Sequence, residues 1–222
     1  MSPTHWFLFI NIIILSLGFS FYTLWVKWKY AMPNHPTGLT GCEVARLVLD
    51  RMGVIHVAVT PVEPPHSPED YLSSEGLFLE KSIYEGRGIQ SLVIAARQSF
   101  LKGQLSDMTF WIHLKKRMTF MAQLAVMLGW LCLLGGLFFS GAAFFANFGL
   151  GAFGVVMLIA IFDLPFELEV GEKTSKIVRE IEGLAPYEFT NFKKMNQAVS
   201  FTGMSYLIQV PVQMCARFLK RK

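Results

Sequence analysis

The sequence predicts a mainly α integral membrane protein with three to four transmembrane helices and a small cytoplasmic α+β domain. Three observations predict this class. Of the 222 residues, 53% are hydrophobic and only 16% are charged, a balance typical of membrane proteins rather than soluble domains. Three stretches of about 20 residues, enough to cross a bilayer, carry no charged side chain. Between them lie segments with helix caps, turn residues and alternating apolar positions, which are typical of a folded domain outside the membrane.

The charge and the cysteines exclude several kinds of partner and site. The net charge of +4 is explained by Lys and Arg placed near anionic lipid, and no basic patch with interleaved aromatic residues indicates nucleic-acid binding. The three cysteines, Cys42, Cys132 and Cys215, are far apart and form no Cys-x-x-Cys motif. They therefore predict neither a disulfide framework nor a metal site built on thiolates.

Residues 1–29 are predicted to form an N-terminal transmembrane anchor. The stretch 6–26, WFLFINIIILSLGFSFYTLWV, has no charge, and tryptophan and tyrosine lie near its ends, where they favour the membrane interface. A cleaved signal peptide is the alternative, but no Lys or Arg precedes Trp6 and no small-x-small cleavage site follows. We therefore expect an uncleaved anchor.

Residues 30–117 are predicted to form a cytoplasmic α+β domain. An amphipathic helix spans 39–53, with Thr40 as its N-cap, Glu43 completing a capping box, and Gly53 at its C-terminal end. The alternating stretch 54–61, VIHVAVTP, reads as a strand.

The second half of this domain follows a proline-rich connector. Residues 76–79 predict a short strand, and 84–88 predict a turn. A second helix is expected over 89–101.

Residues 118–162 are predicted to form a transmembrane helical hairpin, since the apolar runs 118–140 and 142–162 are separated only by a short turn. A cytoplasmic helical segment is expected over 163–197, and Asp163 and Pro165 mark where the third helix leaves the bilayer. The C-terminal segment 198–222 ends in a basic tail. Its weaker run 198–215 contains Gln209, Pro211 and Gln213, so it either spans the membrane or lies partly in the interface.

Lys and Arg near the helix ends predict the orientation. They follow the first span, precede the second and follow the third, while the turn at Ser140–Gly141 has none. The N-terminus and this turn are therefore expected outside, and residues 27–117 and 163–197 in the cytoplasm. The basic tail conflicts with this rule if 198–215 crosses the membrane.

Several motifs, taken in order, resemble one known family. They are TGLTGCEVARLVLDRMG at 37–53, Tyr-Xaa-Gly-Arg at 84–87, SLVIAA at 91–96 and DLPFELE at 163–169. Their order and the anchor resemble the YugP-type bacterial membrane zinc metallopeptidases over about residues 5–215. The resemblance implies a zincin-like domain in the bacterial inner (cytoplasmic) membrane. It also implies a His-Glu-x-x-His motif on helix 89–101 and an acidic third zinc ligand from a Leu-Pro-x-Glu segment.

This sequence departs from that pattern where the chemistry would be. The two motif histidines align with Arg97 and Leu101, and the motif glutamate aligns with Gln98. Arginine has no free lone pair for zinc, glutamine is not a useful general base, and leucine has no ligand atom. Glu167 matches the third-ligand position, but one carboxylate alone does not make a zinc site.

Other residues offer no obvious replacement. Among the five histidines, His5, His35, His56, His66 and His113, no pair is spaced i,i+3 or i,i+4. A metal site assembled from distant residues stays an open alternative.

Two interpretations of Arg97 remain open. It pairs with Glu167 or Glu169 where a metal would lie, so that the remaining acid keeps a cationic partner; or it points to solvent or lipid headgroups. Likewise, the acidic run Glu167, Glu169 and Glu172 is explained either by that pairing or as a solvated helix end.

The sequence as a whole predicts a catalytically inactive relative of these peptidases that acts as a scaffold or accessory subunit of a membrane protein complex. We expect no catalytic residue, no metal site and no cofactor, and the partners are the lipid bilayer and a membrane protein. The alternative is an active membrane zinc metallopeptidase with a non-standard metal site. A transporter or channel is disfavoured because the three strong spans contain no ionisable group.

Overall fold

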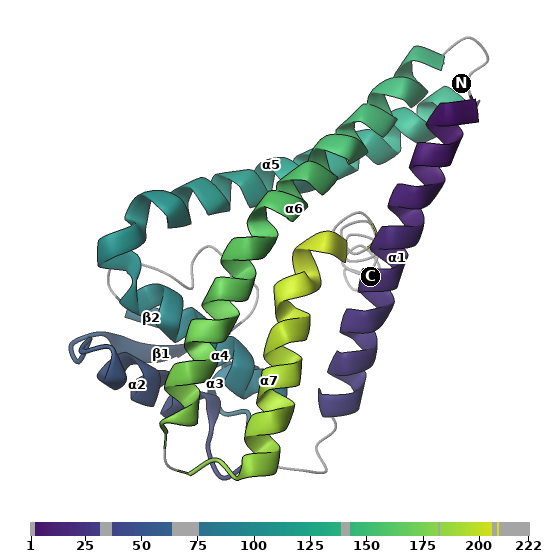
Figure 1. Ribbon diagram of the computed structural model, residues 1–222. Helices are drawn as coiled ribbons and strands as arrows, with labels where there is room; N and C mark the ends of the chain where they lie inside the picture. The colour runs from purple at the N-terminus through teal and green to yellow at the C-terminus, as the bar shows by residue number, and fades with distance from the viewer. Residues whose placement is uncertain are drawn as a thin grey trace. The chain divides into compact units, whose positions relative to one another are not determined.

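The structure is a computed structural model that describes residues 3–31, 37–63, 76–138, 143–181, 183–205 and 208 (Figure 1). Within these ranges, three helices are long and apolar enough to cross a membrane. They are α1 (Pro3–Ala31), α5 (Leu105–Phe138) and α6 (Ala143–Arg179). The mainly α membrane fold predicted from the sequence is confirmed.

The chain divides into two compact units. The first contains Met1–Thr23, Leu114–Pro165 and Phe201–Lys222, and the second contains Leu24–His113 and Phe166–Ser200. Each unit combines stretches that are far apart in the sequence, so this division does not test the boundaries of segments predicted in chain order. The predicted segments 1–29, 30–117, 118–162, 163–197 and 198–222 therefore stay predictions.

In the first unit, α5 and α6 pack closely through small residues. A Cβ placed on Gly136 would lie 2.5 Å from the backbone nitrogen of Ala146, and one on Gly149 would lie 2.6 Å from the carbonyl oxygen of Gly129. Only glycine permits this approach, as is common between membrane helices. The buried core of this pair consists of Ala122, Val126, Leu133, Phe153, Val156 and Met157.

In the same unit, α1 contacts the short 3₁₀ helix η1 (Phe201–Ser205) that follows α7. The ring of Phe19 stacks on Phe201 with 5.4 Å between centroids, and Tyr22 meets Phe201 edge-on. Residues 206–207 and 209–222 lie outside the described residues. Whether 198–215 spans the membrane therefore stays a prediction.

The second unit begins with α2 (Gly41–Arg51), whose predicted capping box is confirmed. The Thr40 hydroxyl accepts a hydrogen bond from the Glu43 backbone N–H, and the Glu43 carboxylate accepts one from the Thr40 N–H. Gly53, two residues past the helix, has a φ of +75°, which favours glycine at this position.

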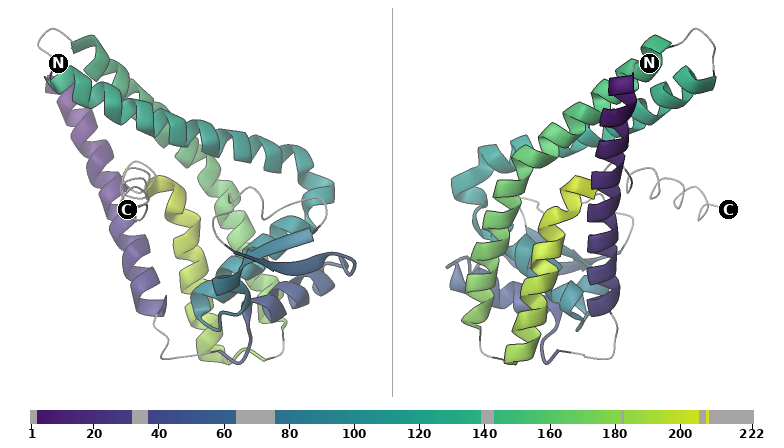
Figure 2. Two further views of the ribbon diagram at one scale, coloured as in Figure 1. Left: turned by 180° about the vertical axis from the view of Figure 1, so that it is seen from behind. Right: turned by 45° about the vertical axis from the view of Figure 1, so that its right-hand side comes forward.

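Two parallel strands, β1 (Ala58–Val62) and β2 (Gly76–Glu80), form the sheet, with Ala58 opposite Gly76 (Figure 2). Strand β2 was predicted, but the expectation of a strand over 54–61 is wrong in its first half. The Arg46 guanidinium donates to the carbonyl oxygens of Ile55 and Val57 at 2.6 and 2.8 Å. These bonds hold 54–57 in a turn, so the strand begins only at Ala58.

A short helix and a turn connect β2 to the central helix of the unit. The four-residue helix α3 (Lys81–Tyr84) was not predicted, whereas α4 (Ile89–Gly103) matches the expected helix. The backbone N–H groups of Thr37 and Gly41 donate to the carbonyls of Arg87 and Gly86, both at 2.9 Å. These bonds fix the Tyr-Xaa-Gly-Arg turn against the start of α2, and thereby the start of α4.

Two helices complete the second unit. Helix α6 passes through Pro165 without ending and continues to Arg179, so the segment expected to begin at 163 begins inside this helix. Helix α7 (Pro186–Ser200) starts with proline at its first position, where a missing N–H costs nothing. The Glu188 carboxylate accepts from the Ala185 N–H at 2.8 Å and caps this end.

Candidate functional site

The candidate site lies on α4, where the sequence places Arg97, Gln98 and Leu101. Apolar residues such as Leu92, Val93 and Ala96 are fully buried, because α4 is a central helix of its unit. Arg97 is also buried, with 6% of its surface exposed. A buried charge of this kind is stable only when it is paired and hydrogen-bonded, so its partners define the site.

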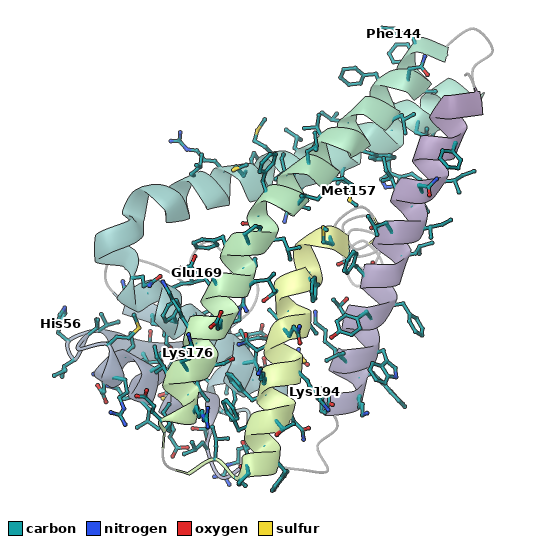
Figure 3. The ribbon with its side chains drawn as sticks, in the orientation of Figure 1. His56, Phe144, Met157, Glu169, Lys176 and Lys194 are labelled. Atoms are coloured by element: carbon teal, nitrogen blue, oxygen red, sulfur yellow. The ribbon has the colours of Figure 1, made fainter. Side chains whose placement is uncertain are left out.

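Arg97 forms an ion pair with Glu167 of α6. Its Nη2 donates to the Glu167 carboxylate and, at 3.2 Å, to the Glu167 carbonyl oxygen. This confirms the predicted pairing of Arg97 with an acid of the 163–169 motif. The other candidate, Glu169, instead pairs with Lys173 at 2.7 Å on the exposed face of α6 (Figure 3).

The second nitrogen of the guanidinium binds α7. Arg97 Nη1 donates to Asn196 Oδ1 at 2.8 Å and to Ser200 Oγ at 3.1 Å. Ser200 Oγ in turn donates to the Glu167 carbonyl at 3.0 Å. The guanidinium therefore links one residue of α4 to one residue of α6 and two of α7, all within the second unit.

Asn196 extends this network along α6. Its amide Nδ2 donates to the Gly171 carbonyl at 2.7 Å and to Ser175 Oγ at 2.8 Å. Gly171 lies directly against the cluster, because a Cβ there would be 3.1 Å from both Arg97 Nη1 and Ser200 Oγ. The cluster is thus closely packed as well as hydrogen-bonded.

Gln98 and Leu101 occupy the positions next to Arg97 in this part of α4. Gln98 Oε1 is buried and has no hydrogen-bond partner in the part of the chain that the structure describes. Leu101 is half-buried and offers no polar atom. Neither side chain can accept a proton from a water molecule at neutral pH, so neither is a general base.

Sequence reasoning missed Asn196 and Ser200. A signal existed, because the two are spaced i,i+4 and so share one face of a helix with buried neighbours Phe192 and Met195. Polar residues on such a face indicate a buried partner. That the partner would be Arg97, about a hundred positions earlier, required the structure.

Burial or hydrogen bonding shifts the pKa of two ionisable groups in the second unit. Burial lowers the pKa of the Lys102 ammonium, which is 6% exposed. A hydrogen bond with Cys42 raises the pKa of the Tyr84 hydroxyl. Cys42 is a free thiol. We assign these groups no chemical role.

The remaining predicted residues lie elsewhere. Glu172 pairs with Lys176 at 2.8 Å and both are exposed, so this end of the acidic run is a solvated helix surface (Figure 3). His56 is exposed in the turn before β1. His35 and His66 are outside the described residues, as are the side chains of His5 and His113.

Comparison with known proteins identifies the family. Residues 5–219 match the family described as "Putative neutral zinc metallopeptidase". The chain belongs to this family. It is also similar to a protein of Bacillus subtilis (strain 168) named "Putative membrane protease YugP", with 25% identity over 178 residues that cover 77% of each chain. No solved structure matches.

Family membership corrects one expectation from the sequence. We expected no cofactor, but the family is one of zinc peptidases, and zinc is therefore the cofactor that membership suggests. The side chains of α4 in this region do not fit that ion, because a guanidinium, an amide and a leucine at 97, 98 and 101 offer zinc no ligand and no general base. Among the described residues, no three His, Cys, Asp or Glu side chains gather in a group that could hold a metal.

Proposed function

We propose that this membrane protein is a non-hydrolysing member of the zinc metallopeptidase family, which acts as a scaffold or accessory subunit of a membrane protein complex. One observation carries the proposal: Glu167, to which the resemblance assigns the third-ligand role, has its carboxylate paired with Arg97. Hydrolysis of a peptide bond by a zinc peptidase needs an activated water and a general base. At the α4 positions to which the resemblance assigns these roles, this chain has Arg97, Gln98 and Leu101.

The scaffold around these positions is well formed, which supports a role in binding. The capping box of α2, the backbone bonds of the turn before α4 and the close α5–α6 packing are all present. Each depends on particular residues such as Thr40, Gly86 and Gly136. A protein with an ordered scaffold and no reactive side chain at these positions of α4 is expected to act through its surfaces.

We further propose the bacterial inner membrane as its location, with the second unit on the cytoplasmic side. Three apolar helices support a membrane environment. The side is inferred from Lys and Arg at the ends of the spans, such as Lys29 after the first and Arg117 before the second. Accessibility of a cysteine introduced at exposed Glu172 to a membrane-impermeant thiol reagent in intact cells would test this. Labelling before lysis would contradict it.

An active peptidase is the second candidate, and family membership is the observation that favours it. In this case the metal ligands would come from a different residue set. Both candidates predict membrane localisation, so activity must decide between them.

The deciding experiment is a hydrolysis assay on the detergent-purified full chain supplied with zinc, using casein and a quenched-fluorescent peptide library. We expect cleavage no faster than that of an identically purified sample from cells lacking the protein. Cleavage above that background that is abolished by a chelator would overturn the proposal. If Glu167→Ala also abolished it, Glu167 would be a working ligand.

The scaffold role needs its own test. The protein is extracted into nanodiscs directly from its native membranes, and the mass of the particle is measured without harsh detergent. A stoichiometric complex with another membrane protein supports the accessory role. A chain that is found alone under these conditions contradicts it.

A further inference from the structure

We infer that the Arg97 guanidinium is a resident cation, fixed in the protein, which takes over the structural task that a metal ion performs when it joins ligands from different helices. This inference shares with the proposed function only the observation that Glu167 is paired with Arg97. It concerns how the second unit is held together and what α4 can be made to bind.

The Arg97 side chain is 7% exposed and the Glu167 side chain 18%. A carboxylate that is largely removed from water needs a cation or several donors nearby. Arg97 supplies the cation, and its fork of donors reaches the side chain and the backbone carbonyl of the same residue.

A metal ion joins distant parts of a chain by accepting ligands from several elements at once. The guanidinium makes the equivalent links as a donor, because it bonds to Glu167 of α6 and to Asn196 and Ser200 of α7. Lysine could not replace it, since only the planar fork donates in several fixed directions.

Positions 97 and 101 of α4 are one helical turn apart and share a face, which is the spacing at which two histidines hold one zinc ion. Position 97 already touches the Glu167 carboxylate. Two histidines and one glutamate make a catalytic-type zinc ligand set. Replacement of Arg97 and Leu101 by histidine should therefore create a site that binds a zinc ion.

The experiment compares the wild type with the triple variant Arg97→His, Gln98→Glu, Leu101→His, both purified in detergent and exposed to zinc. Zinc per chain is measured by elemental mass spectrometry after excess metal is removed. We expect the triple variant to hold about one more equivalent of zinc than the wild type. The matched control adds Glu167→Gln to the triple variant, and we expect this extra zinc to bind at least tenfold more weakly.

A folded triple variant that holds no more zinc than the wild type would overturn the inference. Because that variant could fail to fold, a second comparison uses Arg97→Lys and Arg97→Met. Both are expected to lower the unfolding temperature by several degrees, with Arg97→Met the more damaging. Wild-type stability in both would overturn the inference equally. Neither result depends on the hydrolysis assay, so a failure here is distinguishable from a failure of the proposed function.

Discussion

At position 97, the choice of side chain decides what α4 can do. Arginine keeps its charge at every physiological pH and has five donors but no acceptor. It can therefore satisfy Glu167, Asn196 and Ser200 together, and it cannot act as a ligand or base. Gln98 beside it cannot be ionised either. The site therefore contains many hydrogen bonds, but these two side chains of α4 supply neither a zinc ligand nor a general base.

Gly171 allows the cluster to close. We expect Gly171→Val to lower the free energy of unfolding by about 1–3 kcal/mol, because its side chain would push Arg97 and Ser200 out of their hydrogen bonds. The free energy is measured by denaturant titration in detergent.

The matched control for this variant is Gly154→Val on the same helix, since a Cβ at Gly154 meets no atom within 4 Å. It should leave the free energy of unfolding nearly unchanged. An equal loss in both variants would indicate a general effect of valine in α6 rather than crowding of the cluster.

At the level of elements, α2 depends on its N-terminal cap. Thr40→Ala removes the side-chain oxygen that accepts from the Glu43 N–H, and we expect a loss of about 1 kcal/mol in the free energy of unfolding. Thr40→Ser keeps the hydroxyl and should be close to the wild type. A Thr40→Ser variant as unstable as Thr40→Ala would show that packing, not capping, matters here.

The same cap predicts a pH dependence. Hydrogen bonds from the Thr40 backbone and side chain lower the pKa of Glu43 from its ordinary value of 4.5. Its contribution to stability is therefore complete above about pH 4.5 and is lost as the pH falls through the lower pKa of the folded state. Glu43→Gln keeps a capping residue that does not titrate.

We therefore expect the unfolding temperature of the wild type to fall more steeply than that of Glu43→Gln once the pH drops below about 4.5. Thermal unfolding followed by tryptophan fluorescence measures it. Parallel curves for the two proteins would mean that Glu43 contributes nothing through its charge.

The packing of α5 against α6 depends on Gly136 of α5. Gly136→Ala should destabilise the protein by about 1–3 kcal/mol, since the new Cβ would meet the Ala146 backbone, which cannot turn away. Gly135→Ala, one residue earlier, faces open space and should cost nothing. The difference between the two in denaturant titrations checks the packing, and its absence would contradict the contact.

For the molecule as a whole, local signals in the sequence predicted the helices well. Charge-free runs indicated the three spans, and the Thr40–Glu43 spacing indicated the start of α2. Side-chain hydrogen bonds that compete with strand formation could not be predicted from the local pattern. Arg46 holds 54–57 in a turn, although the pattern of these residues is typical of a strand. Pro165 suggested the exit of a helix from the membrane, yet α6 continues because a proline interrupts only its local hydrogen bonds.

The candidate site was only partly predictable. The resemblance suggested a pairing of Arg97 with Glu167 or Glu169 but left solvent exposure of Arg97 equally open, and the structure decides for Glu167. The α7 residues Asn196 and Ser200 had no such guide, because contacts between residues far apart in sequence leave no local pattern. The absence of a cofactor was an inference from three positions, whereas zinc is suggested by the family as a whole.

The most direct test of this account is a double-mutant cycle on Arg97→Met and Glu167→Gln, which measures the coupling free energy of the pair in the unfolding of the full chain. We predict that each single variant loses about 3 kcal/mol and that the double variant loses much less than their sum, because the interaction between the two side chains is then lost only once. Additive losses, with a coupling free energy near zero, would contradict a resident cation at Arg97 and with it the central claim.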